Sequence, residues 1–316
     1  MDFLYLLEKI RNPILDALFS LITCLGEKEV FLVIAIVIFW CVNKRDGYYV
    51  LMMGLIGTII NQALKLAFRI PRPWVRDPSF TVVEWAKEGA GGYSFPSGHT
   101  QNTAGTFGAL AVTTGRRWMR ITCVVLIILV ALSRMYLGVH TPADVCVSLL
   151  IAALLLAVLY PVFSSEENFH RLMPALMIVS VLLSLGFLLF AFLSPDGTHE
   201  AANLYSARKN ASTLFGCTLC LIPVYFTDKY YTKFDTGATW YAQIVKVAVG
   251  LGLFVLLKLA LSALLDSVLG DEFLSNGIEY FLLVAFAGIL WPMTFKFFAK
   301  MRISALDKLF SKNAKT

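Results

Sequence analysis

The chain has 316 residues, of which 58% are hydrophobic and 15% are charged, and its mean hydropathy is +0.72. This composition excludes a soluble domain and predicts an integral membrane protein with several spanning helices. The formal net charge is only +6. We therefore expect the bilayer to be a partner of the chain, and we expect no nucleic acid to be one.

Apolar stretches predict a series of helices, and prolines and glycines between them mark the starts and stops. In chain order the predicted helices cover residues 13–25, 29–43, 47–68, 98–114, 119–136, 142–164, 172–193, 211–227, 238–265 and 278–295. Several of these stretches approach or reach the roughly 20 residues that a spanning helix needs. We therefore predict an all-α fold, a polytopic transmembrane helix bundle.

The first polar group stands at the end of the predicted helix 47–68, where Lys65 is followed seven positions later by Arg72. Pro71 and Pro73 flank the arginine and end the helix, so both charges can turn toward one point above the membrane. Cations beside lipid are costly without an anion, and phosphate is the obvious one. Taken singly, each cation is better explained as a headgroup anchor that snorkels to the surface.

The longest polar insertion follows, from Pro71 to Ser94, and it contains Trp74, Trp85 and the glycine-rich stretch 89–92. Glycines flanked by tryptophans are typical of an interfacial lid over a site at the membrane surface. A plain surface loop is the alternative, and the two interpretations stay open.

Ser97, Gly98 and His99 stand immediately before or at the start of the predicted helix 98–114. The Ser97 hydroxyl and the first helical amides can point donors at an anion, and Gly98 permits close backbone approach. Ser97 also suits a helix cap, and the two roles can coexist.

Arg134 ends the predicted helix 119–136, and His140 and Asp144 follow at the start of the next helix. A spacing of four can place the carboxylate behind the imidazole, which leaves the other ring nitrogen as a nucleophile. A capping box formed by Thr141 and Asp144, with Pro142 at the first helical position, fits equally well and needs no catalysis.

Two imidazoles and a carboxylate, from His99, His140 and Asp144, would also suit zinc. However, the three cations of the same segments outnumber this single carboxylate, so a divalent cation would be repelled and an anion fits better. We therefore expect no metal site and no other cofactor.

Counted along the chain, the predicted helix ends that carry these motifs all meet on one membrane face. The opposite face receives many basic residues, including Lys44, Arg116 and Lys229, whereas later loops on the motif side hold only Arg208 and Lys209 as cations. By the positive-inside rule, the motif side is expected outside the cytoplasm.

In this order, Lys-x6-Arg-Pro, Pro-Ser-Gly-His and Ser-Arg-x5-His-x3-Asp resemble the three-part signature of the type 2 phosphatidic acid phosphatase superfamily. Every signature position is filled between Lys65 and Asp144. The resemblance implies a six-helix, phosphatase-like transmembrane catalytic core within residues 1–165. It leaves residues 166–316 as additional C-terminal transmembrane helices without an assigned role.

The resemblance also implies residue roles, because a histidine of that superfamily attacks phosphorus and forms a phosphohistidine. By motif position, His140 would be the nucleophile, Asp144 its orienting partner and His99 the general acid. The implied phosphate-binding residues are Lys65, Arg72, Ser97, Gly98 and Arg134.

The membrane-embedded form and the stretch 136–142 resemble the lipid-phosphatase branches of that superfamily. We therefore expect a metal-independent phosphatase for a lipid phosphate or pyrophosphate, in the plasma membrane with its site on the extracytoplasmic face. Candidate substrates are undecaprenyl pyrophosphate, phosphatidic acid, phosphatidylglycerol phosphate and sphingoid-base phosphates, and an outward-facing site suits the first. The alternatives are a lipid phosphotransferase with the same intermediate and a noncatalytic phospholipid-binding or transport protein.

Overall fold

The computed structural model describes residues 1–197 and 200–302, and every regular element in this part of the chain is a helix. The elements are α1 (Asp2–Lys9), α2 (Pro13–Thr23), η1 (Cys24–Gly26), α3 (Lys28–Cys41), α4 (Lys44–Phe68), α5 (Pro73–Arg76), α6 (Glu84–Glu88), α7 (Gly98–Thr113), α8 (Arg117–Tyr136), α9 (Pro142–Phe163), α10 (Glu166–Leu193), α11 (Ala201–Thr227), η2 (Asp228–Thr232), α12 (Trp240–Leu269), α13 (Glu272–Ala285), η3 (Phe286–Leu290), η4 (Pro292–Thr294) and α14 (Phe295–Lys300). The predicted all-α fold is confirmed.

Seven helical segments of the described chain are long and apolar enough to cross a membrane. They contain α4, α8, α9, α10, α11, α12 and α13. The prediction of a polytopic bundle with additional C-terminal membrane helices is therefore confirmed as well. The helix α7, with 16 residues, is shorter than these segments.

Each predicted helix overlaps an observed one, but three of the later helices begin earlier than hydropathy indicates. The helix α10 begins at Glu166, α11 at Ala201 and α13 at Glu272, where residues 172, 211 and 278 were expected. The helix α13 also ends at Ala285, and η3 and η4 cover most of the remaining predicted stretch. Hydropathy locates only the apolar part of a helix, whereas these first turns are polar and still hydrogen-bonded. The Ser165 side chain, for example, accepts from the Asn168 amide at 3.1 Å and caps α10.

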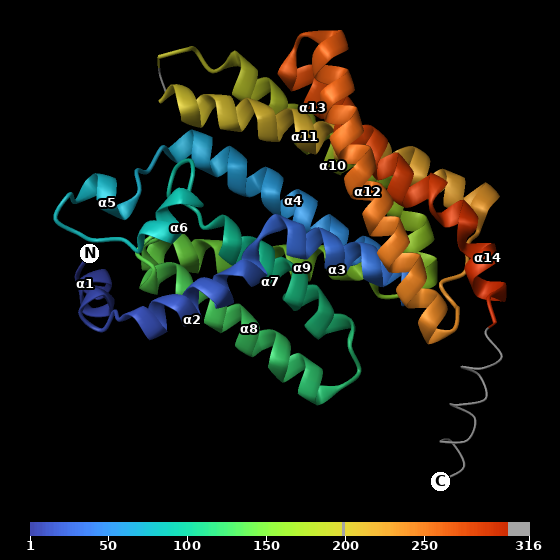
Figure 1. Cartoon of the computed structure of the whole chain (residues 1–316), viewed down its shortest axis with the longest axis horizontal. Coiled ribbons are helices and arrows are strands. Elements are labelled where there is room, and N and C mark those ends of the chain that lie inside the picture. The colour runs from blue at the N-terminus through green and yellow to red at the C-terminus, as the bar shows by residue number, and fades with distance from the viewer. Residues whose placement is uncertain (198–199, 303–316) are drawn as a thin grey trace.

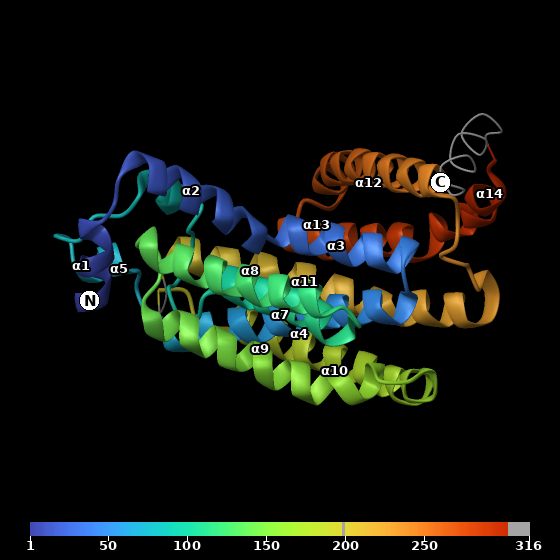
Figure 2. The ribbon, with the colours of Figure 1, turned by 90° about the horizontal axis from the view of Figure 1, so that it is seen from below.

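In Figure 1 the helices α4, α8 and α11 run obliquely along the long axis of the molecule, whereas α12 runs steeply across it. The N-terminus lies near one end and α14 near the other. The helix α7 packs against α4, α8 and α9. Seen from below, α12 lies on one face of the molecule and α9 and α10 lie on the opposite face (Figure 2). The central position of α7 brings its first residues to the end of the bundle where α5 and α6 lie.

The loops at the other end of the bundle join the two halves of the chain through ion pairs. The Lys44 ammonium donates to the Asp228 carboxylate at 2.8 Å, and Arg45 Nη1 lies 3.4 Å from Glu166 Oε1. The structure thus brings together the loops that were expected to share the membrane face opposite the motifs.

Aromatic packing in the largest buried cluster crosses residue 165. Tyr49 of α4 stacks on Phe163 of α9 with ring centroids 4.8 Å apart, and Phe163 packs 5.9 Å from Phe169 of α10. Division of the chain into residues 1–165 and 166–316 stays a prediction, and residues 303–316 lie outside the described part.

The helices α11 and α13 approach most closely at a pair of glycines. A Cβ at Gly216 would overlap the carbonyl oxygen of Gly277, which is backbone and cannot rotate away. By contrast, a Cβ at Gly186, in the middle of α10, would meet no atom within 4 Å. The contact between α11 and α13 therefore requires glycine at position 216.

We expect Gly216→Ala to destabilise the protein by about 1–3 kcal/mol, which is typical of overpacking. Gly186→Ala is the matched control, and we expect it to be neutral or to gain up to about 1 kcal/mol of helix propensity. Thermal unfolding of the purified proteins in detergent compares the two. A melting temperature of Gly216→Ala at or above that of Gly186→Ala would contradict this packing.

Candidate active site

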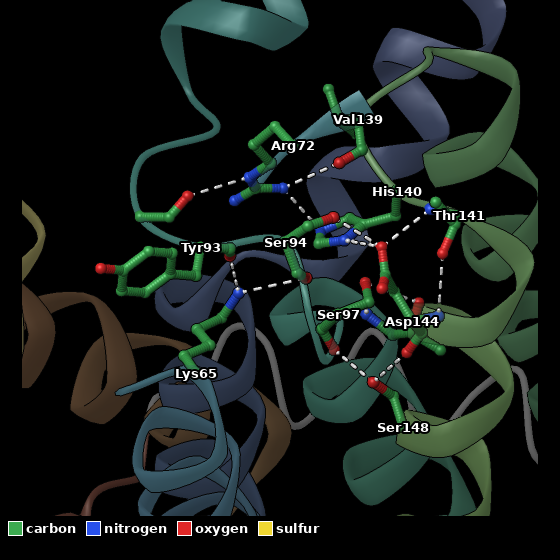
Figure 3. A network of polar contacts seen from close by, with 12 residues as sticks. Lys65, Arg72, Tyr93, Ser94, Ser97, Val139, His140, Thr141, Asp144 and Ser148 are labelled. Carbon is green, nitrogen blue, oxygen red and sulfur yellow. Dashed lines mark hydrogen bonds and ion pairs between the residues drawn. The ribbon is translucent and has the colours of Figure 1, made fainter. Parts of the chain in front are cut away.

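The three polar segments identified in the sequence meet at the end of the bundle that carries α5 and α6 (Figure 3). Lys65 lies in the last turn of α4, and Arg134 lies in the last turn of α8. His140 lies in the turn between α8 and α9, and Ser97 caps α7, so that His99 is the second residue of α7. The ends of α4 and α8, the starts of α7 and α9, and the turns beside them thus supply the side chains of one site.

Lys65 and Arg72 bind the segment that connects α6 to α7 (Figure 3). The Lys65 ammonium donates to the carbonyl groups of residues 93 and 94. Arg72 Nη2 and Nε donate to the carbonyl groups of residues 91 and 92, at 2.8 and 3.1 Å. Of the two interpretations of the polar insertion, these contacts favour the lid, because its last residues lie directly over two site cations.

His140 lies between a guanidinium and a carboxylate, one at each ring nitrogen. Arg72 Nη1 lies 3.0 Å from His140 Nε2 and donates to the Val139 carbonyl at 2.9 Å. On the other side, His140 Nδ1 lies 3.4 Å from Asp144 Oδ2. With the ring proton assigned to Nδ1, where it faces the carboxylate, Nε2 carries the lone pair.

Asp144 combines the two roles that the sequence left open. Its Oδ2 accepts from the Thr141 amide at 2.8 Å, and its own amide donates to Thr141 Oγ1 at 3.3 Å, which completes the capping box. The same Oδ2 faces His140 and accepts a 2.6 Å bond from the Ser94 hydroxyl. The cap therefore fixes the carboxylate that faces the imidazole.

Ser97 serves as the helix cap of α7. Its hydroxyl oxygen accepts from the Thr100 amide at 3.4 Å, and its own amide donates to the Asp144 carbonyl at 3.1 Å. The amides of Gly98 and His99 belong to the first turn of α7, so they have no acceptor within the helix. These two amides are the helix donors best placed for an anion, as the sequence indicated.

Arg134 and His99 are held by residues that the sequence analysis did not single out. Arg134 Nη1 donates to Thr23 Oγ1 at 2.8 Å, and His99 Nε2 lies 3.1 Å from Glu27 Oε1. His99 therefore pairs with Glu27, whereas His140 pairs with Asp144. The three side chains do not pair with one another as the zinc alternative grouped them. No motif or periodicity marks Thr23 or Glu27, and only a tertiary contact reveals them.

The site is buried and carries an excess of positive charge. The exposed fractions are 9% for Lys65, 7% for Arg72, 3% for Arg134 and 1% each for His140 and Asp144. Burial, followed by the charges of Arg72, Arg134 and Lys65, holds the pKa of His140 well below its usual value. The imidazole is therefore neutral at physiological pH, and with its proton on Nδ1 the Nε2 atom accepts the hydrogen bond from Arg72 Nη1.

Comparison with known proteins identifies the family. Residues 47–167 match the family model described as PAP2 superfamily, and residues 209–302 match the model described as PAP2 superfamily phosphatase, transmembrane extension. No solved structure gives a significant match to the chain.

Several curated proteins are similar to the chain. Undecaprenyl-diphosphatase BcrC of Bacillus subtilis (strain 168) is 30% identical over 151 residues, which cover 46% of this chain and 73% of that protein. Lipid phosphate phosphatase delta of Arabidopsis thaliana is 25% identical over 288 residues, which cover 78% of this chain and 68% of that protein. Sphingosine-1-phosphate phosphatase 1 of Mus musculus is 28% identical over 194 residues, 59% of this chain but only 44% of that relative.

The chain therefore belongs to the PAP2 superfamily and is an integral membrane protein with multiple transmembrane helices. The family predicted from the three motifs is confirmed.

We expect Arg72→Lys to loosen the lid, because an ammonium cannot reproduce the fork of bonds to residues 91, 92 and 139. Ser94, whose amide donates to the Ile70 carbonyl at 2.8 Å, reports lid opening. Its amide hydrogen should exchange at least about 10-fold faster in the variant, the equivalent of one lost charged hydrogen bond. Arg76→Lys, at an exposed position of α5, is the control, and equal exchange in the two variants would contradict the tether.

Proposed function

We propose that this PAP2 superfamily member is a phosphatase for a lipid phosphate or pyrophosphate, and that it acts through a phosphohistidine on His140. The observation that carries the proposal is the environment of His140. Its Nε2 lies 3.0 Å from Arg72 Nη1, and its Nδ1 faces the carboxylate of Asp144. A neutral imidazole beside an arginine can attack a phosphoryl group that the same arginine binds.

The proposed reaction has two steps. His140 Nε2 attacks phosphorus, the bond to the leaving oxygen breaks, and His99 donates a proton to that oxygen. Water then attacks the phosphohistidine, gives its proton to His99, and releases phosphate as the bond between nitrogen and phosphorus breaks. Asp144 stabilises the positive charge that develops on His140 in the first step.

Charge stabilisation comes from the cationic side chains and from the start of α7. Lys65, Arg72 and Arg134 would bind the phosphoryl oxygens, and the amides of Gly98 and His99 would add two donors. Binding requires Lys65 and Arg72 to exchange their bonds with the lid carbonyls for bonds with the substrate. Arg72 Nη1 must also turn from His140 Nε2 to a phosphoryl oxygen, which frees the Nε2 lone pair for the attack. In this proposal no metal is required, because these groups supply the positive charge.

The substrate class follows from the membrane location and from the names of the relatives. Those names include a diphosphate of a polyprenol, a sphingoid-base phosphate and a phosphatidylglycerophosphate. Their shared chemistry is a terminal phosphoryl group on a lipid, and undecaprenyl pyrophosphate is the candidate that an extracytoplasmic site in the plasma membrane suits best. The charge distribution of the loops supports that orientation.

The C-terminal helices are proposed to complete the wall of the site. A small pocket beside Lys65 is lined by Gln62 of α4 and Tyr93 of the lid, and on its other side by Asn203 and Ser206 of α11. The first part of α11, which precedes the segment that matches the transmembrane extension, therefore contributes polar side chains next to a lysine that is proposed to bind phosphate.

We expect the purified protein to release phosphate from a lipid substrate in excess chelator. The substitution His140→Ala should lower kcat by at least about 10³-fold, because the covalent route is lost. His170→Ala is the control, since His170 lies half-exposed at the opposite end of the bundle beside Tyr225. A panel of polyprenyl, glycerolipid and sphingoid phosphates identifies the substrate. Turnover by His140→Ala at a wild-type rate would rule out the mechanism.

Hydrolysis and phosphoryl transfer differ in the fate of water. In water labelled with oxygen-18, we expect each phosphate released from a lipid monoester to contain one labelled oxygen, because water attacks the phosphohistidine. Mass spectrometry of the phosphate from a single turnover measures this. Phosphate on an added alcohol, with no labelled free phosphate, would show a phosphotransferase.

A further inference from the structure

The corner between α2 and α3 contacts two of the site residues, although it lies outside both segments that match the family. It comprises residues 23–27, whereas the matches cover residues 47–167 and 209–302. Its Thr23 hydroxyl accepts from Arg134, and its Glu27 carboxylate pairs with His99. One short segment therefore supports both a phosphate-binding arginine and the proposed general acid.

The Glu27 side chain is directed at His99 instead of capping its own helix. Glu27 is the N-cap residue of α3, but its side chain makes no capping hydrogen bond. Its Oε1 lies 3.1 Å from His99 Nε2, across 72 residues of sequence. Gly26 permits this approach, because a Cβ at that position would lie 2.8 Å from the His99 Cβ.

Electrostatics around His99 oppose a protonated ring, and the Glu27 carboxylate counteracts them. Burial, followed by the charge of Arg134, lowers the pKa of His99, whereas the hydrogen bond to Glu27 raises it. The charged and titratable groups that act on His99 are Arg134, Arg72, His140 and Glu27. The two guanidinium groups oppose a third positive charge, and Glu27 is the only carboxylate of the described chain that bonds to this ring. The hydrogen bond from His99 holds the pKa of Glu27 below its usual value, so Glu27 is ionised at neutral pH.

The remaining ring nitrogen is free to act on a substrate. Among the described residues, His99 Nδ1 has no hydrogen-bond partner, because the ring contacts Glu27 through Nε2 alone. The imidazole side chain is 17% exposed and that of Glu27 is 45% exposed, so the pair lies at the rim of the site. A protonated ring with Nε2–H on Glu27 presents Nδ1–H as its second donor.

We propose that Glu27 is a positioning residue that orients His99 and favours its protonated form, so that Nδ1–H donates to the leaving oxygen. The inference rests on the proposed function. In the first step the Nδ1 proton moves to the leaving oxygen as its bond to phosphorus breaks. In the second step the neutral Nδ1 takes a proton from the attacking water, and Glu27 remains ionised throughout.

The test compares two leaving groups in the full-length protein. A lipid alcohol needs a proton to leave, whereas p-nitrophenolate leaves without one. For Glu27→Gln we expect kcat on the best lipid monoester of the panel to fall about 10- to 100-fold. This is part of the rate enhancement of ~10²–10⁴ that a positioned general acid contributes. Hydrolysis of p-nitrophenyl phosphate should stay within about 3-fold of wild type, because binding and nucleophilic attack are unaffected.

The pH profile gives a second readout. Without the negative charge of Glu27, His99 loses its proton at lower pH, so the alkaline limb of kcat for the lipid monoester moves to lower pH. Glu29→Gln is the matched control, because Glu29 is an exposed carboxylate that pairs only with Lys28, at 3.9 Å. This control should match wild type on both substrates and in its pH profile.

The outcomes separate the two proposals. A wild-type protein that hydrolyses neither substrate would overturn the proposed function. An active wild type whose Glu27→Gln variant loses both activities equally would overturn the inference alone, because the corner would then be merely structural. Full lipid turnover by Glu27→Gln, with an unshifted pH profile, would overturn it as well.

Discussion

The structure depends on three buried cations that share one end of an apolar bundle with a single buried carboxylate. Lys65, Arg72 and Arg134 have exposed fractions of 3–9%, and Asp144, at 1%, is the buried carboxylate that the described part of the chain places among them. Such an excess of charge is costly beside lipid. The described chain offsets it with carbonyl groups of the lid and with the Thr23 hydroxyl, and a phosphoryl group would offset it more completely.

This imbalance explains why the site is assembled from helix ends. The ends of α4 and α8 present cations, the start of α7 presents amide donors, and the capping box of α9 presents the carboxylate. The Ser97 cap of α7 and the capping box of α9 also satisfy terminal amides of their own helices. Folding and the proposed phosphate binding therefore use the same side chains, and carbonyl groups of residues 91–94 now accept hydrogen bonds from two of them, Lys65 and Arg72.

Much of this arrangement could be predicted from the sequence, because its determinants are local. Apolar length determines the spanning helices, and Thr141, Pro142 and Asp144 mark the start of α9 within four residues. The contacts from Glu27 to His99 and from Ser94 to Asp144 could not be predicted, because they join residues 72 and 50 positions apart without a repeating pattern. Hydropathy likewise missed the polar first turns of α10 and α11. The Ser165 side chain caps the first turn of α10, whereas buried Leu204 and Ala207 pack the first turns of α11.

The most direct measurement of the central claim is an experimental structure with orthovanadate, which imitates phosphorus under attack by a nucleophile. We predict vanadium bonded to His140 Nε2, its equatorial oxygens within hydrogen-bond distance of Lys65, Arg72 and Arg134, and the lid carbonyls displaced from the two cations they now hold. Vanadate bound elsewhere, or bound without any bond to His140, would contradict the account.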